Sequence, residues 1–181
     1  MQHKLCNDFK KQEVMMQYVW GYVSPLGEMT MASDGKALIG LWFNGQKYFA
    51  RTLGEHIEKD LPIFEDTRRW LDAYFSGQQP SFTPALAPEG SAFRKRVWQS
   101  LLRIPYGQTV TYGDIAREIA HERGAEQMSA QAVGGAVGHN PISLIIPCHR
   151  VVGSDGSLTG YAGGTDKKRA LLLLEQSHKS T

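Results

Sequence analysis

Residues 145–153 read IIPCHRVVG, which places a cysteine beside a histidine between two runs of β-branched residues. Pro147 cannot donate a hydrogen bond to a sheet ladder, so we expect a strand over Ile142–Ile146 to stop there and to present Cys148 at a cleft. A thiol is a good nucleophile only as a thiolate, and a neighbouring base is one way to form it. The adjacency alone fits a buried structural cysteine equally well.

Upstream of this stretch, apolar residues recur at helical spacing in three segments. Ser91 and Thr111 are good N-caps for the first two helices, and Ser129 opens a third that runs through Val137 and is closed by Gly138. The last two helices fit a helix-turn-helix in outline, although most helical hairpins do not touch DNA. The third helix is almost devoid of side chains that read base edges, so it should not read sequence.

The first half of the chain reads as a hairpin meander followed by one helix. The helix is expected over Thr67–Ser76, and its aromatic side chains, including Tyr74, are expected in the core. The segment 78–90 carries three prolines and no periodicity, which is typical of a linker or an extended crossing segment. The expected strands cover residues 17–23, 28–32 and 37–43.

Length and charge favour two small domains, which we place at residues 1–85 and 86–181 of the 181-residue chain. The formal net charge is +2, but the two halves differ. Residues 1–90 hold nine basic and eleven acidic side chains, whereas residues 91–181 hold eleven basic and seven acidic ones. A polyanionic partner is therefore expected at the C-terminal part.

The cysteines exclude a disulfide framework, since only Cys6 and Cys148 occur, and they favour a reducing compartment. Cys6 has only His3 nearby and a distant His56, which is short of a tetrahedral zinc set, so we expect no metal and no cofactor. The chain has no apolar run long enough to span a bilayer and no signal-peptide pattern. We expect a soluble, cytoplasmic monomer.

Several motifs in a fixed order resemble one protein family. They are the segment Phe93–Trp98, IPYG at 104–107, the Asn140-Pro141 pair, PCHRVVG at 147–153 and TGYAGG at 159–164. This set is similar to the O6-alkylguanine-DNA alkyltransferases, or methylated-DNA-protein-cysteine methyltransferases. The resemblance implies a mixed α/β (α+β) fold, with an N-terminal ribonuclease-H-like meander and helix before a C-terminal, winged-helix-like helix-turn-helix domain.

The same resemblance implies DNA repair by direct reversal of damage. Cys148 would take the alkyl group from O6 of guanine, with O4-alkylthymine left open as a second substrate. A thioether is inert, so each molecule would react once. His149 would take the thiol proton, through a water in relatives, and Glu175 would orient the histidine. The alternative is that Glu175 is an ordinary solvated residue near the end of a leucine-rich helix.

Further roles follow from the family pattern. Tyr112 would protonate the leaving guanine and press on the backbone, or else simply pack on the helices. Asn140 would bond backbone around the cysteine strand, and Arg150, pointing away from His149 along that strand, is expected to form a structural ion pair. The substrate pocket would comprise Pro147, Val151, Val152, Tyr161, Ala162, Gly163 and Lys168.

Double-stranded DNA would bind through its minor groove with little sequence preference and with the damaged nucleotide rotated out of the stack. Relatives commonly place an intercalating arginine where this chain has Gln131, which lacks the charge of a guanidinium. The long loop 120–128 offers Arg123 or Met128 as alternative wedges. Expected DNA contacts are Thr111, Tyr112, Arg123, Ala130, Gln131, Ala132 and Gly134.

Competing functions fit less well. Relatives that bind alkylated DNA without repairing it replace the cysteine, and Cys148 is present. A cysteine protease needs its histidine and Asn or Asp elsewhere in a different fold, and a tyrosine phosphatase needs Cys-x5-Arg, where this chain has Ser154.

Overall fold

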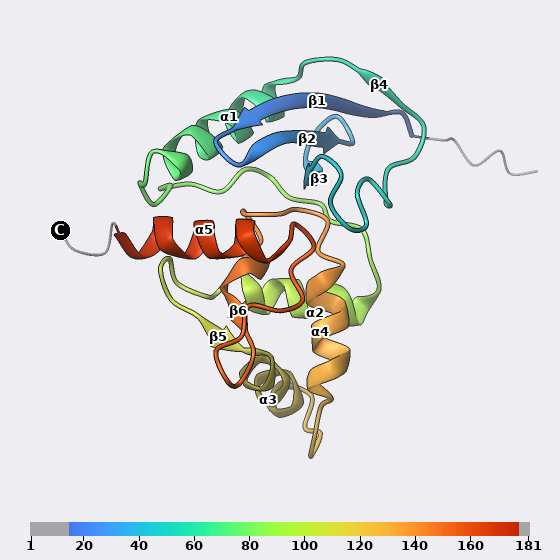
Figure 1. Cartoon of the computed structure of the whole chain (residues 1–181). Coiled ribbons are helices and arrows are strands. Elements are labelled where there is room, and N and C mark those ends of the chain that lie inside the picture. Colours follow the sequence, from blue (N-terminus) through green and yellow to red (C-terminus); the bar gives the residue numbers. More distant parts are fainter. Residues whose placement is uncertain (1–14, 178–181) are drawn as a thin grey trace, which may run out of the picture.

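A computed structural model describes residues 15–177, with a sheet in the N-terminal part and helices in the C-terminal part (Figure 1). The sheet has the order β3-β2-β1-β4. Neighbours β1/β2 and β2/β3 are antiparallel, as the predicted meander requires, whereas β4 is parallel to β1. The strand β4 was not predicted because its three residues are all exposed and lack an apolar pattern. The bounds are β1 Gln17–Ser24, β2 Gly27–Ser33, β3 Leu38–Phe43 and β4 His56–Glu58.

Helix α1 spans Pro62–Phe75 and so begins five residues before the predicted start. Proline suits the first turn of a helix, because its missing N–H would be unpaired there in any case. Ile63 and Phe64 in the added turn are buried. Tyr74 is fully buried, as expected for the aromatic face of this helix.

The C-terminal helices begin at the predicted caps. Ser91, Thr111 and Ser129 each accept a hydrogen bond from a backbone N–H in the first turn, and Thr111 forms a capping box with Asp114. The helix that was predicted to run through Val137 ends at Gly138, one residue later. The bounds are α2 Ala92–Leu101, α3 Tyr112–Glu122, α4 Ala130–Gly138 and α5 Thr165–Ser177, with a short parallel pair β5 Val110–Thr111 and β6 Val151–Val152.

The strand predicted over Ile142–Ile146 does not form, although the structure describes all five residues. They fold into turns, with Leu144 at φ +70° and Ile146 N donating to Ile142 O at 3.2 Å. Cys148–Arg150 then forms the 3-10 helix η1. The five residues are at most 5% exposed, so their apolar character reflects burial on all sides; Ile142 alone of the five pairs with a strand, in a single bridge to Leu41 of β3.

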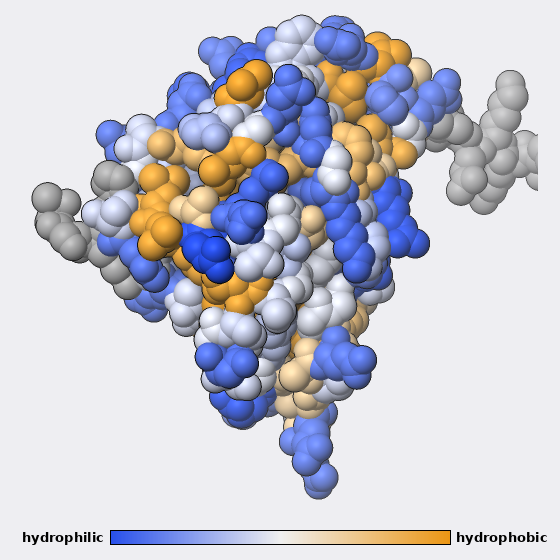
Figure 2. Space-filling view, in the orientation of Figure 1, coloured by the Kyte–Doolittle hydropathy of each residue, from blue (hydrophilic) through white to orange (hydrophobic). Residues whose placement is uncertain are grey.

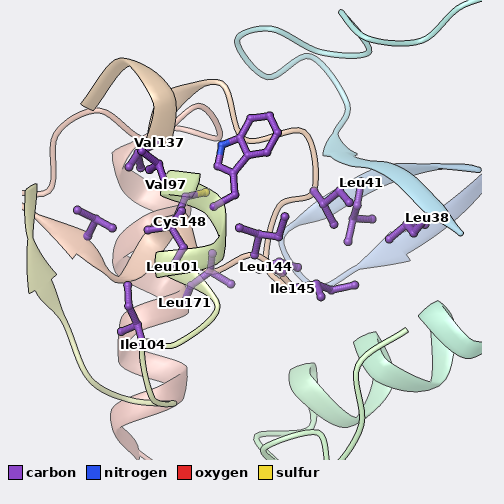
Figure 3. Packing of buried hydrophobic residues seen from close by; sticks show 14 of the residues in the cluster. Leu38, Leu41, Val97, Leu101, Ile104, Val137, Leu144, Ile145, Cys148 and Leu171 are labelled. Atoms are coloured by element: carbon purple, nitrogen blue, oxygen red, sulfur yellow. The ribbon is translucent and has the colours of Figure 1, made fainter. Parts of the chain in front are cut away.

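Strand β3 joins the two parts of the molecule. Its Leu41 N donates to Pro141 O at 2.9 Å, and Ser143 N donates to Leu41 O at 2.8 Å. The expected crossing segment also runs beside β3, where Leu38 N donates to Ala85 O. Figure 3 shows the resulting shared core, in which Leu38 and Leu41 lie with side chains of the C-terminal part, Cys148 among them. This continuity fixes the cysteine segment against the sheet.

Within residues 15–177, every helix is too short or too polar to cross a bilayer. The face drawn in Figure 2 mixes hydrophilic side chains with separate apolar patches. Cys6 and His3, considered above for zinc, lie outside the described residues.

Candidate active site

Glu175 on α5 is fully buried and accepts hydrogen bonds from several residues. His149 Nε2 lies 2.6 Å from Oε1, Arg150 Nε lies 2.9 Å from Oε2, and Gly107 N donates to Oε2 at 2.9 Å. Burial by itself raises the pKa of this carboxyl, but His149 and Arg150 outweigh it and lower the pKa to about 2. Glu175 is therefore a buried carboxylate, and the alternative of a solvated surface residue is wrong.

His149 is fully buried beside Glu175. Burial lowers the pKa of its imidazole and outweighs the opposing effect of Glu175, so the ring is neutral. Because Nε2 faces a carboxylate, it carries the proton and leaves Nδ1 as the acceptor. Nδ1 is buried and has no hydrogen-bond partner among residues 15–177. The ring is thus arranged as a base, with Nε2 held by Glu175 and Nδ1 able to accept a proton.

Cys148 begins the 3-10 helix and is 5% exposed. Burial raises the pKa of its thiol, and the Asn140 side chain, Lys168 and nearby backbone N–H groups only partly oppose that effect. The cysteine therefore rests as a thiol at neutral pH. A nucleophile of this kind needs a base to remove its proton as it reacts.

Asn140 holds the turn before the cysteine. Its Nδ2 donates to Ile146 O at 2.8 Å and to Ile142 O at 3.2 Å, while its Oδ1 accepts from Ile142 N at 3.0 Å. The side chain supplies backbone partners that a sheet ladder would otherwise provide. It bonds backbone around the cysteine as expected, although that backbone is a turn and not a strand.

Arg150 lies on the same side as His149, contrary to expectation. The 3-10 helix removes the alternation that a strand would impose, so both side chains reach Glu175. The expected ion pair does form, with Arg150 Nε 2.9 Å from Glu175 Oε2, and Nη1 donates to Ile104 O at 2.8 Å.

A buried lysine, Lys168, holds both β6 and the segment that follows it. Lys168 Nζ donates to Val151 O at 2.5 Å and to Thr159 O at 3.1 Å. Burial lowers the pKa of Lys168 to about 8, with Cys148 opposing the shift. Tyr112 also donates to Thr159 O, at 2.8 Å, and Lys47 N donates to Ala162 O at 3.1 Å. Loop 159–164 is therefore held by hydrogen bonds from α5, from α3 and from the segment after β3.

A groove runs between this loop and the small residues of α4. One cavity, of about 710 Å³, lies between α3, α4 and the loop, and a second, of about 390 Å³, lies between the loop, α4 and the segment after β3. Gly134 and Gly160 line both cavities, so the two are adjacent. A Cβ at Gly160 would stand 2.7 Å from the Tyr112 hydroxyl, which explains why this wall needs glycine.

Comparison with known proteins identifies the family. Residues 92–177 match the DNA-binding domain of 6-O-methylguanine DNA methyltransferase, and residues 18–88 match the ribonuclease-like domain of the same enzyme. The chain belongs to the 6-O-methylguanine DNA methyltransferase family. The mixed fold expected from the motifs, with an N-terminal sheet domain and a C-terminal helical domain, is confirmed.

Individual methyltransferases are similar along most of their length. The methylated-DNA–protein-cysteine methyltransferase of Haemophilus influenzae is 42% identical over 88% of this chain and 86% of its own. The protein of that name from Mycobacterium bovis is 47% identical over 85% and 89%. The Mycobacterium tuberculosis O6-methylguanine methyltransferase structure has a TM-score of 0.77 at 43% identity, covering 92% of this chain and 96% of that chain. The M. tuberculosis OGT structure in complex with DNA has a TM-score of 0.74 at 42% identity, covering 90% and 94%.

The methyltransferase fold brings most of the predicted site residues together. Cys148, His149, Glu175 and Asn140 lie around η1, as described above. The larger cavity is lined by Thr111, Tyr112, Ala130, Gln131 and Gly134, and the smaller one by Tyr161 and Ala162.

Other predicted residues lie elsewhere or have other partners. Arg123 is the exposed C-cap of α3 and, within the described chain, lines neither cavity of the groove. Ala132 is exposed on α4, and Met128 is half-buried against the core. Pro147 lines a different cavity, beside Arg150 and Tyr106. Of the three wedge candidates, only Gln131 lines the groove.

Sequence reasoning missed one member of the methyltransferase site. Tyr74 on α1 donates its hydroxyl to Glu175 Oε1 at 2.8 Å, across 101 residues of chain. Helical periodicity predicts that this side chain is buried, but it cannot indicate which distant carboxylate the hydroxyl meets.

Proposed function

We propose that this protein repairs DNA by transferring an alkyl group from O6 of guanine to Cys148, once per molecule. The observation that carries the proposal is the buried cysteine followed by a histidine whose Nε2 is held 2.6 Å from Glu175 and whose Nδ1 has no partner among residues 15–177. Membership of the methyltransferase family supports the same activity.

The reaction begins with loss of the thiol proton. His149 Nδ1 takes it, directly or through one water, and Glu175 stabilises the imidazolium that forms. The sulfur attacks the alkyl carbon in line with the bond to O6, so that an S–C bond forms as the C–O bond breaks. Tyr112 gives a proton to the departing guanine and regains one from solvent, while His149 releases its own. The products are guanine and an S-alkylcysteine.

Single use follows from the product. A thioether does not react further under these conditions, and Cys148 is the only free cysteine in the part of the chain that the structure describes. Because the thioether is inert, the alkyl group stays on the protein.

We propose double-stranded DNA, held through its minor groove, as the partner. The small residues of α4 allow a close approach to a shallow groove, and they offer few groups that read base edges. Cys148 is 5% exposed, so the damaged base must rotate out of the stack and enter beside loop 159–164. Gln131, which lines this groove, would fill the gap left behind. The pocket around the base would include Val151, Val152, Gly163 and Lys168.

One chain supplies the whole proposed site, so we propose that a monomer is the active form. We place the division between the two domains near residue 85, and we place the protein in the reducing cytoplasm, where Cys148 stays a thiol.

The test is a titration of repair. A fixed amount of protein is mixed with rising amounts of duplex DNA that contains O6-methylguanine, and the repaired guanine is counted. We expect repair to stop at one guanine per protein molecule, and we expect Cys148→Ala to bind the duplex but repair none. Binding without repair by the unaltered protein would make it a damage-binding protein. Repair of many guanines per molecule would exclude the single-use reaction.

A further inference from the structure

Tyr74 belongs to the N-terminal sheet domain, yet its hydroxyl contacts both members of the buried pair formed by His149 and Glu175. It donates to Glu175 Oε1 at 2.8 Å and lies 3.2 Å from His149 Nε2. The same Oε1 lies 2.6 Å from His149 Nε2. The same carboxylate oxygen therefore accepts hydrogen bonds from both Tyr74 and His149.

The ring of Tyr74 has little freedom to move. It is fully buried and stacks on Trp70, with centroids 5.3 Å apart and planes 8° apart. Phe75 and Tyr106 meet it edge to face, and so does the imidazole of His149, at 6.2 Å. A side chain packed on every side holds its hydroxyl in one place.

The hydroxyl also keeps its proton. Burial raises the pKa of Tyr74 well above its usual value, and the charge of Glu175 raises it further. The group therefore stays a hydrogen-bond donor throughout the neutral range. A donor on Oε1 draws electron density from the carboxylate and so weakens its hold on a protonated His149.

We propose that Tyr74 is a positioning residue for alkyl transfer, through which the N-terminal sheet domain fixes the Glu175–His149 pair and limits the basicity of His149. The inference rests on the proposed function. By holding Oε1 next to the imidazole, the hydroxyl keeps Nε2 on Glu175 and leaves Nδ1 for the thiol proton. The other charged groups that act on His149, Arg150 and Lys168, are untouched by a change at Tyr74.

The chain offers a matched pair of variants. Tyr74→Phe removes only the hydroxyl. Tyr22→Phe removes a hydroxyl that bonds to the same helix, since Tyr22 donates to Asp72 of α1 at 2.8 Å, but that bond does not involve His149 or Glu175. Both variants are first checked by thermal melting, and both are tested below their melting temperatures.

The measurement is the rate of a single methyl transfer from duplex O6-methylguanine as a function of pH. We expect Tyr74→Phe to react about tenfold more slowly at neutral pH, as befits the loss of one hydrogen bond to a charged group. We expect its acidic limb to move to higher pH, because Glu175 then stabilises the imidazolium more strongly. Tyr22→Phe should match the unaltered protein in both respects.

A second readout needs no turnover. The NMR titration of the His149 ring should move to higher pH in Tyr74→Phe and stay in place in Tyr22→Phe. Slower transfer with an unmoved acidic limb and an unmoved His149 titration would reduce Tyr74 to a structural residue and overturn the inference, as would an equal effect of the two variants. Absence of methyl transfer by the unaltered protein would instead refute the proposed function.

Discussion

His149 Nε2 lies 2.6 Å from Glu175 Oε1, and both side chains are fully buried. Such a pair fixes the tautomer of the imidazole, because the buried carboxylate requires a donor. The carboxylate is in turn held by Arg150, Gly107 and Tyr74.

Removing the charge of Glu175 should affect both activity and stability. In Glu175→Gln the imidazolium loses its counter-charge and Arg150 loses its ion-pair partner. We expect methyl transfer to slow by about a hundredfold and the free energy of unfolding to fall by about 3 kcal/mol. Rapid-mixing transfer assays and urea unfolding measure the two effects.

Glu118→Gln is a suitable control, since Glu118 pairs with Arg103 on the exposed surface. Glu118→Gln should lower the free energy of unfolding by less than about 1 kcal/mol and leave the rate of methyl transfer unchanged. Equal losses in the two variants would argue against a special role of the buried pair.

Acid should destabilise the fold through Glu175 and His149. Folding lowers the pKa of Glu175 to about 2, so its stabilisation is present above its unfolded pKa and is lost as pH falls toward 2. Measured from an ordinary value of about 4.3, the shift corresponds to about 3 kcal/mol. Folding also lowers the pKa of His149, so the free energy of unfolding falls further once the pH drops below the pKa that this histidine has in the unfolded chain.

Urea unfolding between pH 7 and pH 3 should therefore show falling stability, with a smaller fall in Glu175→Gln. A pH dependence identical in both proteins would show that other groups are responsible.

Asn140→Ala should loosen the turn before the cysteine. Three buried backbone groups lose their side-chain partner, so we expect a loss of about 3 kcal/mol in stability, at about 1 kcal/mol for each bond. Transfer should slow, whereas affinity for DNA should hold, because α3 and α4 are unchanged. Asn44→Ala, which removes an exposed bond with Thr30, is the matched control and should alter neither property. Unchanged transfer in Asn140→Ala would mean that the turn does not depend on this side chain.

Gln131→Ala should separate base rotation from chemistry. Gln131 lines the groove, so its loss should slow transfer from duplex DNA and leave transfer from free O6-methylguanine nearly unchanged. Arg123→Ala should leave both rates unchanged, since Arg123 lies at the exposed end of α3. If Arg123→Ala slowed transfer from duplex DNA and Gln131→Ala did not, the wedge would be assigned to the loop. Equal slowing on both substrates would place Gln131 in the active site itself.

Local patterns in the sequence predict much of this structure. Ser91, Thr111 and Ser129 are caps that act on neighbouring residues, so they can be found without knowing the fold. The turn at 142–146 could not be found in this way, because a run of buried β-branched residues is compatible with both a strand and a buried turn.

The missed contacts of the site are long-range. The residue types near Cys148 predict a nucleophile and a base, but the bond from Tyr74 to Glu175 depends on how α1 packs against α5. The resemblance to a family predicts residues that the family's motifs contain, and Tyr74 lies outside those motifs.

The central claim is that Cys148 accepts the alkyl group, and the direct measurement is peptide mass spectrometry after reaction with duplex DNA that contains O6-methylguanine. We predict one added methyl group on the peptide that contains Cys148, with none elsewhere and none in Cys148→Ala. A methyl group on any other residue, or repaired DNA with an unmodified Cys148, would contradict the account.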